Sequence, residues 1–227
     1  ERDSKTCASE EQNNFVNFDY FITPEINFVT PKISSSLFSK KPRVALLREQ
    51  GINGQYDMAA ALMASGFEVE DLHMSEIGER VKDLGAFNGL VIPGGFSYGD
   101  VMGAGRGMAN SILLKPKMKK IFKRFFEDKT KFAFGVCNGC QFLSNLAEII
   151  PGANGWPSFN RNTSNQYECR LVQVKIEKSQ SILMQGMEGS TIPVMVSHGE
   201  GRVDFKENLV SKSIAKYVDP RHKPTSS

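Results

Sequence analysis

A cysteine flanked by two glycines is the part of this sequence best suited to chemistry. Gly135 and Gly139 lie two residues before and after Cys137, between the apolar run 132–134 and an apolar, helix-like segment at 142–147. A nucleophile on a sharp strand-to-helix turn needs small residues at these positions, because the backbone kinks there and the side chain must stand clear of the sheet. The helix N-terminus that follows stabilises a thiolate and offers N–H groups to an oxyanion. The spacing therefore favours a nucleophilic Cys137.

Other interpretations of the same stretch stay open. Cys137 and Cys140 form a C-x-x-C pair, which also occurs in redox sites and in half-sites for zinc, and both could be structural cysteines. Zinc needs further ligands at suitable spacing, whereas Cys7 and Cys169 are isolated and pair with no histidine. We therefore predict no metal site. Cys140 falls one helical turn beyond the nucleophile, so we expect it to be packed.

Composition excludes several classes of protein. The 227 residues are 40% hydrophobic and 23% charged, as is ordinary for a globular protein, and a net charge of +3 is too small to predict nucleic-acid binding. No apolar run reaches membrane-spanning length and no signal peptide opens the chain, so no membrane partner is expected. Four cysteines without a framework pattern suggest a reducing compartment, which predicts a cytoplasmic location.

Short buried strands alternate with helices between residues 43 and 136. The pattern predicts strands at 44–47, 67–72, 90–92 and 132–136 and helices at 55–65 and 118–126, with Gly66 ending the first helix. Such alternation is typical of an α/β fold with a parallel sheet and right-handed crossovers. Because ligands bind at the carboxyl ends of parallel strands, we expect the glycine-marked loops after the first, third and fourth strands to share one edge. Beyond Ile150 the chain is β-rich, with further strands at 168–176 and 192–196.

The loop after the third strand is glycine-rich. Gly94 and Gly95 let the backbone approach a ligand closely and point N–H groups at it, and four more glycines follow before residue 108. This pattern is weak support for phosphate binding and is also typical of a mobile or tightly turned loop. Beside a cysteine turn at the next strand, it predicts half of an oxyanion hole.

Residues 1–40 differ from the rest. They are rich in Ser, Asn and Thr and show no sustained period, but contain too many aromatic and aliphatic residues for a free linker. We interpret them as an extended arm that packs on another part, followed by a joint near Lys40-Lys41-Pro42.

Four motifs in this order resemble the glutaminase domains of phosphoribosylformylglycinamidine synthase, also called formylglycinamide ribonucleotide amidotransferase. They are Arg-Glu-Gln-Gly-Ile-Asn at 48–53, Gly-Gly-Phe-Ser-Tyr-Gly-Asp-Val at 94–101, Gly-Val-Cys-Asn-Gly-Cys-Gln at 135–141 and His-Gly-Glu-Gly-Arg at 198–202. The likeness covers about 43–219 and is greatest to the large single-chain form. It implies a class I glutamine amidotransferase with a flavodoxin-like α/β fold and a β-rich C-terminal part. The implied reaction is glutamine hydrolysis that supplies ammonia for the ATP-dependent conversion of formylglycinamide ribonucleotide to formylglycinamidine ribonucleotide in purine synthesis.

The resemblance also assigns roles. It implies that Cys137 attacks the glutamine amide, that the oxyanion hole comes from the N–H groups of Asn138 and of the Gly94-Gly95-Phe96 turn, and that Gln141 holds the substrate. L-Glutamine and the synthetase domain of the same full-length chain are the implied partners. ATP and Mg²⁺ are expected in that absent synthetase domain and no cofactor in this one. Residues 1–40 would be the connector from the synthetase domain, and 41–227 the amidotransferase domain.

One departure bears on activity. The family's triad ends in a His-Pro-Glu near the C-terminus of the domain, and this sequence contains no His-Pro-Glu; its one His-x-Glu, His198-Gly199-Glu200, lies in the fourth motif. The resemblance thus implies a C-terminally incomplete domain that keeps its nucleophile and lacks its catalytic His and Glu. His198 lies in a matching motif, but we expect it to be structural rather than the base. A catalytically inactive partial module that packs on a partner, or a cysteine hydrolase of the same fold, are the alternatives.

Overall fold

The computed structural model describes residues 40–77, 83–178, 181–205 and 215–218. The chain divides into two compact units, and each is described here by itself. The larger unit comprises residues 31–169 and 197–211, and the smaller unit comprises 1–30, 170–196 and 212–227. The predicted connector arm, 1–40, lies outside the described residues except for Lys40.

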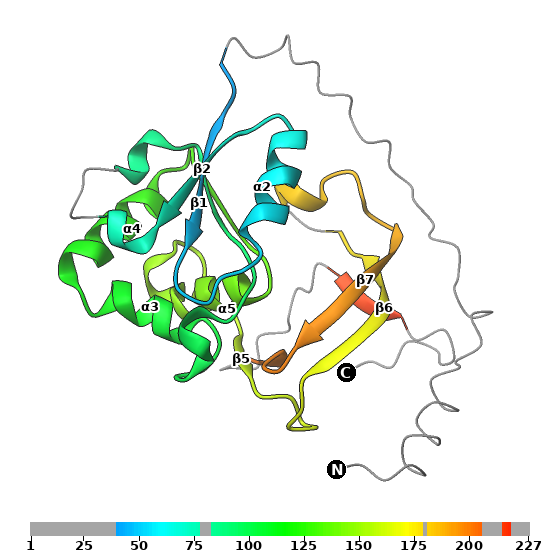
Figure 1. Ribbon diagram of the computed structural model, residues 1–227. Helices are drawn as coiled ribbons and strands as arrows, with labels where there is room; N and C mark the ends of the chain where they lie inside the picture. Colours follow the sequence, from blue (N-terminus) through cyan, green and yellow to red (C-terminus); the bar gives the residue numbers. More distant parts are fainter. Residues whose placement is uncertain (1–39, 78–82, 179–180, 206–214, 219–227) are drawn as a thin grey trace. The chain divides into compact units, whose positions relative to one another are not determined.

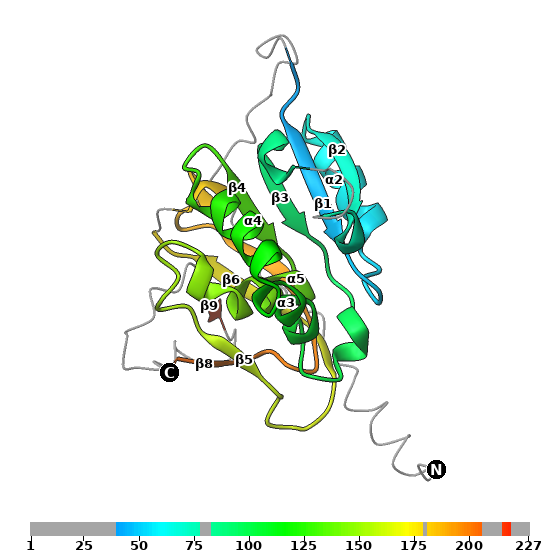
Figure 2. The same cartoon turned by 90° about the vertical axis from the view of Figure 1, so that its left-hand side faces the viewer.

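A four-stranded parallel sheet forms the centre of the larger unit. Its strands are β1 (Arg43–Arg48), β2 (Glu68–His73), β3 (Gly89–Ile92) and β4 (Phe132–Gly135), in the order β2-β1-β3-β4 (Figures 1 and 2). Residues 44 and 69, 44 and 89, and 89 and 132 are register partners. All four strands were predicted within one or two residues, and the predicted α/β class is confirmed. Because the strands are parallel, the loops that follow them emerge at one edge of the sheet.

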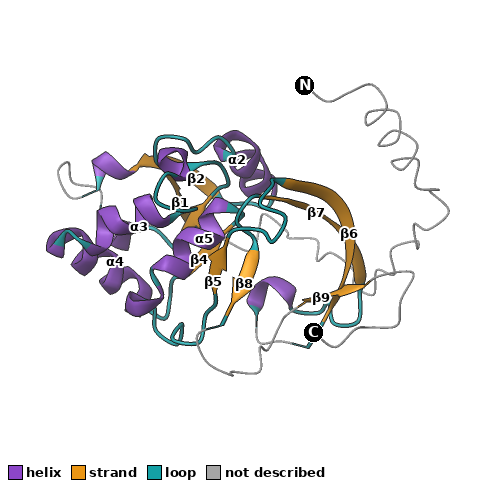
Figure 3. Cartoon of the chain, turned by 90° about the horizontal axis from the view of Figure 1, so that it is seen from below, coloured by secondary structure: helices purple, strands orange, loops and turns teal. Residues whose placement is uncertain are grey.

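Helices cover both faces of this sheet. Side chains of a strand alternate between faces, and Val44 and Leu46 of β1 pack toward α2 (Gln55–Ala64) while Ala45 and Leu47 join a separate core. That second core is built with α3 (Arg106–Leu113), α4 (Pro116–Glu127) and α5 (Asn138–Asn145). Figure 1 shows α2 on the opposite side of the sheet from α3 and α4, and Figure 3 shows α3, α4 and α5 grouped together. The burial of both faces explains why β1 and β3 read as continuous apolar runs.

Local sequence explains where the helices begin and end. Gly66, in a left-handed conformation at φ +93°, follows α2; its N–H bonds Met63 O and the Phe67 N–H bonds Leu62 O. This pair of bonds satisfies carbonyls that the helix end leaves without partners. Pro116 starts α4, where a missing N–H costs nothing, and Met118, Phe122 and other apolar residues of α4 are buried on one stripe.

Helix α3 was not predicted. We interpreted the glycines beyond residue 99 as part of a loop, yet Gly105, at φ +67°, caps α3 and Gly107 lies inside it. The helix could have been predicted from the spacing of Met108, Ala109 and Ile112, which are buried together on one face. Short 3-10 turns complete the connections at 74–76, 84–86, 97–100, 147–149 and 182–184.

The remaining strands form two small sheets. In the larger unit, β5 (Ser158–Asn160) pairs antiparallel with β8 (Arg202–Asp204). Most of β6 (Glu168–Ile176) and β7 (Thr191–His198) and all of β9 (Ala215–Val218) belong to the smaller unit, in the order β7-β6-β9. The predicted β-rich C-terminal part is confirmed. Among the described residues, no helix combines the length and apolar character needed to cross a membrane.

Candidate active site

Cys137 lies in the sharp turn between β4 and α5, with φ 53° and ψ −114°. A positive φ at a residue other than glycine costs of the order of 1–3 kcal/mol and persists only where the surroundings impose it. Both flanking glycines are required by packing. A Cβ on Gly135 would lie 2.4 Å from Gly139 O, and one on Gly139 would lie 2.0 Å from Ile92 O. The glycine spacing seen in the sequence is thus the packing condition for a strained turn that presents Cys137.

The Cys137 thiol is accessible. The residue is exposed, and Sγ is 3.7 Å from Ser197 O, to which the thiol donates. No hydrogen bond joins Cys137 to a histidine or a carboxylate in the part of the chain that the structure describes. A cavity of about 290 Å³ opens beside it. The cavity is lined by Gly95, Phe96, Gly99, Asp100, Ala104, Cys137, Gln141, Arg161, Asn165, Gln166, Tyr167, Ser197, His198, Gly199 and Glu200.

The backbone N–H groups of Gly95 and Asn138 are among those near the thiol that have no backbone acceptor in the described part of the chain. Gly95 and Ile52 form an isolated antiparallel β-bridge. The hydrogen bonds of this bridge are made by the neighbouring residues, so the Gly95 N–H takes no part in them. In that bridge the Phe96 N–H donates to Gly51 O at 2.8 Å and the Asn53 N–H donates to Gly94 O at 3.3 Å, while Gly95 between them donates to neither. The N–H of Phe96, which we had assigned to the oxyanion hole, is therefore engaged, and that part of the prediction is wrong.

A side chain at Gly95 would clash with the backbone after β1, and one at Gly94 would press on Cys137. A Cβ on Gly95, where φ is +147°, would lie 2.6 Å from Gly51 O, and one on Gly94 would lie 3.2 Å from the Cβ of Cys137. Gly94 thus allows the turn to come close to the nucleophile. Phe96 contributes its side chain, which is partly exposed in the cavity and whose ring lies 6.3 Å from that of Tyr167.

The side chain of Asn138 ties the turn after β3 to the start of α5. Its Oδ1 accepts from the Ser97 hydroxyl at 2.7 Å, and its Nδ2 donates to Asp100 Oδ1 at 2.9 Å. Asn138 and Ser97 are both buried. Because both ends of the amide are bonded, the Asn138 N–H is held in a fixed place relative to the Gly95 turn.

Asp100 is a partly buried carboxyl on the same turn. Burial raises its pKa above the ordinary value of 3.8, and the nearby charge of Glu200 adds to the rise. The hydrogen bonds from Asn138 and from the Gly105 N–H act in the opposite direction but do not cancel it. The sequence analysis gave Asp100 and Ser97 no role, although both lie inside a motif that it quoted.

Gln141 is buried on the first turn of α5 and contacts the loop after β7. Its Nε2 donates to Glu200 O at 2.6 Å, and the Glu200 carboxylate accepts from the Ala104 N–H at 2.8 Å. The side chain lines the cavity while it holds one of the cavity walls in place. Its role as a substrate ligand stays a prediction.

His198 is bonded within the same loop. Its Nδ1 lies 3.0 Å from Asn162 Oδ1, and its carbonyl accepts from Asn162 Nδ2 at 2.8 Å. Asn162 Oδ1 also accepts from the Gly201 N–H at 3.1 Å. These contacts support the structural role that we expect for His198.

The second cysteine of the C-x-x-C pair differs from its prediction. Cys140 is exposed, so the prediction that it is packed is wrong; neighbouring protein still desolvates its thiol enough to raise the pKa, with a further contribution from Cys137. Within the residues that the structure describes, no group of three or more His, Cys, Asp or Glu side chains is placed to hold a metal ion.

The structure brings Cys137, Gly95, Phe96 and Gln141 to one cavity, with Gly94 against the thiol and Asn138 next to it in the chain. The sequence analysis missed the residues that fix this arrangement: Ser97, Asp100, Asn162, Ser197 and Glu200. For all of these except Asn162, the available signal was a polar residue among the glycines of 94–103 or 197–202.

Comparison with known proteins places the chain in a family. Residues 41–227 match the family of CobB/CobQ-like glutamine amidotransferase domains. The chain is similar to PurLQS from Thermotoga maritima, with 25% sequence identity and a TM-score of 0.62 over 79% of this chain and 76% of that one. It is also similar to a glutamine amidotransferase from Thermotoga maritima, with 19% identity and a TM-score of 0.44 over 73% of this chain and 63% of that one, which is too distant to support an assignment. Because the family match covers most of its length, the chain belongs to the CobB/CobQ-like glutamine amidotransferase family.

Proposed function

We propose that this chain hydrolyses L-glutamine and supplies the ammonia to a phosphoribosylformylglycinamidine synthase. The observation that carries the proposal is the strained turn at Cys137, which presents a thiol to a cavity beside two backbone N–H groups that have no backbone acceptor in the described part of the chain. The four motifs that resemble this family and the likeness to PurLQS support the choice of synthase.

In the first step, the Cys137 sulfur attacks the side-chain carbonyl carbon of glutamine. The carbonyl oxygen becomes an oxyanion, and the N–H groups of Gly95 and Asn138 stabilise it as its charge develops. The C–N bond then breaks, and the nitrogen leaves as ammonia with the proton that the thiol gave up. The product on the protein is a γ-glutamyl thioester at Cys137.

In the second step, water attacks the thioester and releases glutamate and the free thiol. This step needs a proton acceptor, and general acid–base assistance is worth about 10²–10⁴-fold. The Cys137 thiol donates to a backbone carbonyl, that of Ser197, in the described part of the chain. We therefore expect the chain alone to form the thioester faster than it hydrolyses it.

The cavity walls suit an amino-acid substrate. Two acidic residues, Asp100 and Glu200, and one basic residue, Arg161, are among those that line the cavity. A zwitterion such as glutamine presents an ammonium group and a carboxylate, which residues of these types can bind. Gln141 and the ring of Phe96 would contact the aliphatic part and the amide of the side chain.

The partner in this proposal is the synthetase domain of the same full-length protein, in the cytoplasm. ATP and Mg²⁺ would act in that domain, where ammonia attacks the activated amide of formylglycinamide ribonucleotide. Neither group is needed for the chemistry at Cys137.

Covalent labelling tests the proposal. A chloroketone analogue of glutamine should alkylate Cys137, and L-glutamine should slow the labelling, whereas L-asparagine should not. The Cys140→Ala variant should be labelled like the wild type and Cys137→Ala should not. Labelling that L-glutamine leaves unchanged would point to a cysteine hydrolase with another substrate, and no labelling of a folded chain would point to an inactive module.

A further inference from the structure

Four backbone hydrogen bonds join the loop after β1 to the segment that carries the Gly95 N–H. Their donor–acceptor distances are 2.8–3.3 Å, and they run from the N–H groups of Asn53 and Gly54 to Gly94 O, from the Phe96 N–H to Gly51 O and from the Tyr98 N–H to Gln50 O. Gly95 thus lies between two residues that are bonded to the loop. The direction of its N–H therefore depends on the shape of the loop after β1.

This loop begins with a tight turn at 49–52. The Ile52 N–H donates to Glu49 O at 3.0 Å, and Gly51, the third residue of the turn, has φ +90°. A type II turn requires a left-handed third residue, which glycine adopts without a steric cost. A side chain at Gly51 would overlap the carbonyl of Phe96, so the turn lies directly against the segment that carries Gly95.

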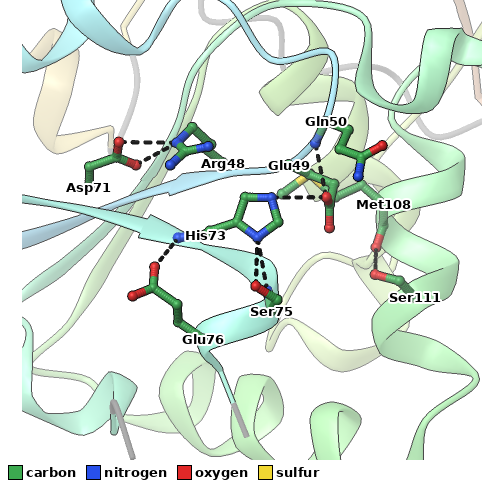
Figure 4. A network of polar contacts seen from close by, with 9 residues as sticks. All are labelled: Arg48, Glu49, Gln50, Asp71, His73, Ser75, Glu76, Met108 and Ser111. Atoms are coloured by element: carbon green, nitrogen blue, oxygen red, sulfur yellow. Dashed lines mark hydrogen bonds and ion pairs between the residues drawn. The ribbon is translucent and has the colours of Figure 1, made fainter. Parts of the chain in front are cut away.

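The side chain of Glu49 holds the start of the turn. It is 7% exposed, and its Oε1 accepts from the Gln50 N–H at 2.9 Å and lies 3.3 Å from His73 Nε2 (Figure 4). A buried carboxylate costs free energy unless it is paired or hydrogen-bonded. These two contacts therefore keep the carboxylate, and the backbone of Gln50 with it, in one place.

His73, the last residue of β2, is fixed as well. Its Nδ1 accepts from the Ser75 N–H at 3.2 Å, and its own N–H donates to Glu76 Oε2 at 2.8 Å (Figure 4). Because Nδ1 is an acceptor, the ring proton is on Nε2, the nitrogen that faces Glu49. The pair thus joins the end of β2 to the end of β1, and the backbone bonds join the end of β1 to the segment after β3. This is also the order of these strands in the sheet.

We propose that Glu49, supported by His73, is a positioning residue for the oxyanion hole. It fixes the turn at 49–52, and that turn fixes the Gly95 N–H through the four backbone bonds. The inference rests on the proposed glutaminase chemistry. Glu49 and His73 line a separate cavity of about 480 Å³ and are not among the described residues that line the cavity beside Cys137, so both act at a distance from substrate and thiol.

Two reagents separate positioning from a general effect on the thiol. A glutamine chloroketone reacts through an anionic carbonyl adduct that the N–H groups stabilise, whereas iodoacetamide alkylates the thiol by direct displacement without an oxyanion. Glu49→Ala should slow the chloroketone reaction of Cys137 about tenfold and leave the iodoacetamide reaction unchanged. Glu148→Ala is the matched control and should change neither, because it removes an exposed carboxylate whose ion pair is with Lys119.

Two further variants test how the side chain acts. Glu49→Gln keeps an oxygen that can accept from the Gln50 N–H, so its chloroketone reaction should stay close to the wild-type rate. His73→Ala removes one of the two contacts and should slow that reaction about threefold, which gives the answer if Glu49→Ala does not fold. Because the proposal requires an acceptor at this position, a Glu49→Gln variant as slow as Glu49→Ala would contradict it.

Hydrogen exchange gives a second readout that does not depend on glutamine. The N–H groups that join the loop after β1 to residues 94–98 report directly on the contact between them. We expect faster exchange in peptides around 50–54 and 94–98 for Glu49→Ala and, to a smaller extent, for His73→Ala, and unchanged exchange for Glu148→Ala. Unchanged exchange in the first two variants, or equal slowing of both reagents, would overturn the proposal. If no chloroketone labelled the wild-type chain while exchange was still faster in the variants, the glutaminase function would be contradicted and the role of Glu49 in the turn supported.

Discussion

The side-chain amide of Asn138 donates to Asp100 Oδ1 at 2.9 Å, so the residue that follows the nucleophile in the chain is bonded to the turn that follows another strand. This contact joins the two halves of the candidate oxyanion hole. One N–H belongs to Asn138 itself, and the other belongs to Gly95, five residues before Asp100. The distance between the two donors therefore depends on a hydrogen bond between side chains, and not on the sheet alone.

Asp100→Asn should change how stability depends on pH. The pKa of Asp100 is raised in the folded protein, so its proton is bound more tightly in the folded than in the unfolded state. The resulting contribution to the free energy of unfolding is fully present below pH 3.8, the ordinary pKa of the carboxyl. It is lost as the pH rises through the higher pKa of Asp100 in the folded state. Relative to Asp100→Asn, the wild type should thus lose stability as pH rises across this range. Urea unfolding of both proteins at several pH values measures the difference in their free energies of unfolding. A difference that does not change with pH would contradict the raised pKa of Asp100.

Gly139→Ala should disrupt the turn at Cys137. The added Cβ would lie 2.0 Å from Ile92 O, a backbone atom that cannot move without displacing β3. Overpacking of this kind costs about 1–3 kcal/mol, and we expect the upper end of that range. Gly199→Ala is the matched control, because the nearest atom to its Cβ is 3.8 Å away. Thermal and urea unfolding compare the two; equal stabilities would show that the turn tolerates a side chain.

Asn162→Ala should destabilise the loop that holds Ser197 beside the thiol. Asn162 is 4% exposed and bonds His198 O, the Gly201 N–H and Gln166 O, so its removal breaks three partly buried hydrogen bonds. The expected loss in the free energy of unfolding is about 1–3 kcal/mol. Asn154→Ala, at an exposed asparagine, should stay within about 0.5 kcal/mol of the wild type. If both variants unfolded alike, the Asn162 network would have no structural role.

The sequence predicted the sheet because β1 and β3 are buried on both faces and therefore read as apolar runs. It predicted the turn at Cys137 because only glycine fits at 135 and 139, and membership of the glutamine amidotransferases is confirmed. The sequence did not predict α3, because the glycines at 105 and 107 are typical of a loop. Residue 107 is a glycine inside a helix, because the ring of Tyr98 occupies the space that a side chain would need. Such a contact between distant residues leaves no local pattern.

The supporting polar contacts were beyond prediction for the same reason. The bond between Asn138 and Asp100 spans 38 residues, and that between Glu200 and Ala104 spans 96. The Phe96 N–H was misassigned because its partner, Gly51 O, belongs to the loop after β1. The residue types identified the candidate site residues. The fold is needed to show which of their N–H groups have no acceptor.

Mass spectrometry after rapid mixing with L-glutamine and acid quench tests the central claim most directly. The account predicts a γ-glutamyl thioester that accumulates on the wild-type chain, maps to Cys137, persists in Cys140→Ala and is absent in Cys137→Ala. Thioester formation on Cys140, or no adduct on a folded wild-type chain at saturating glutamine, would contradict it.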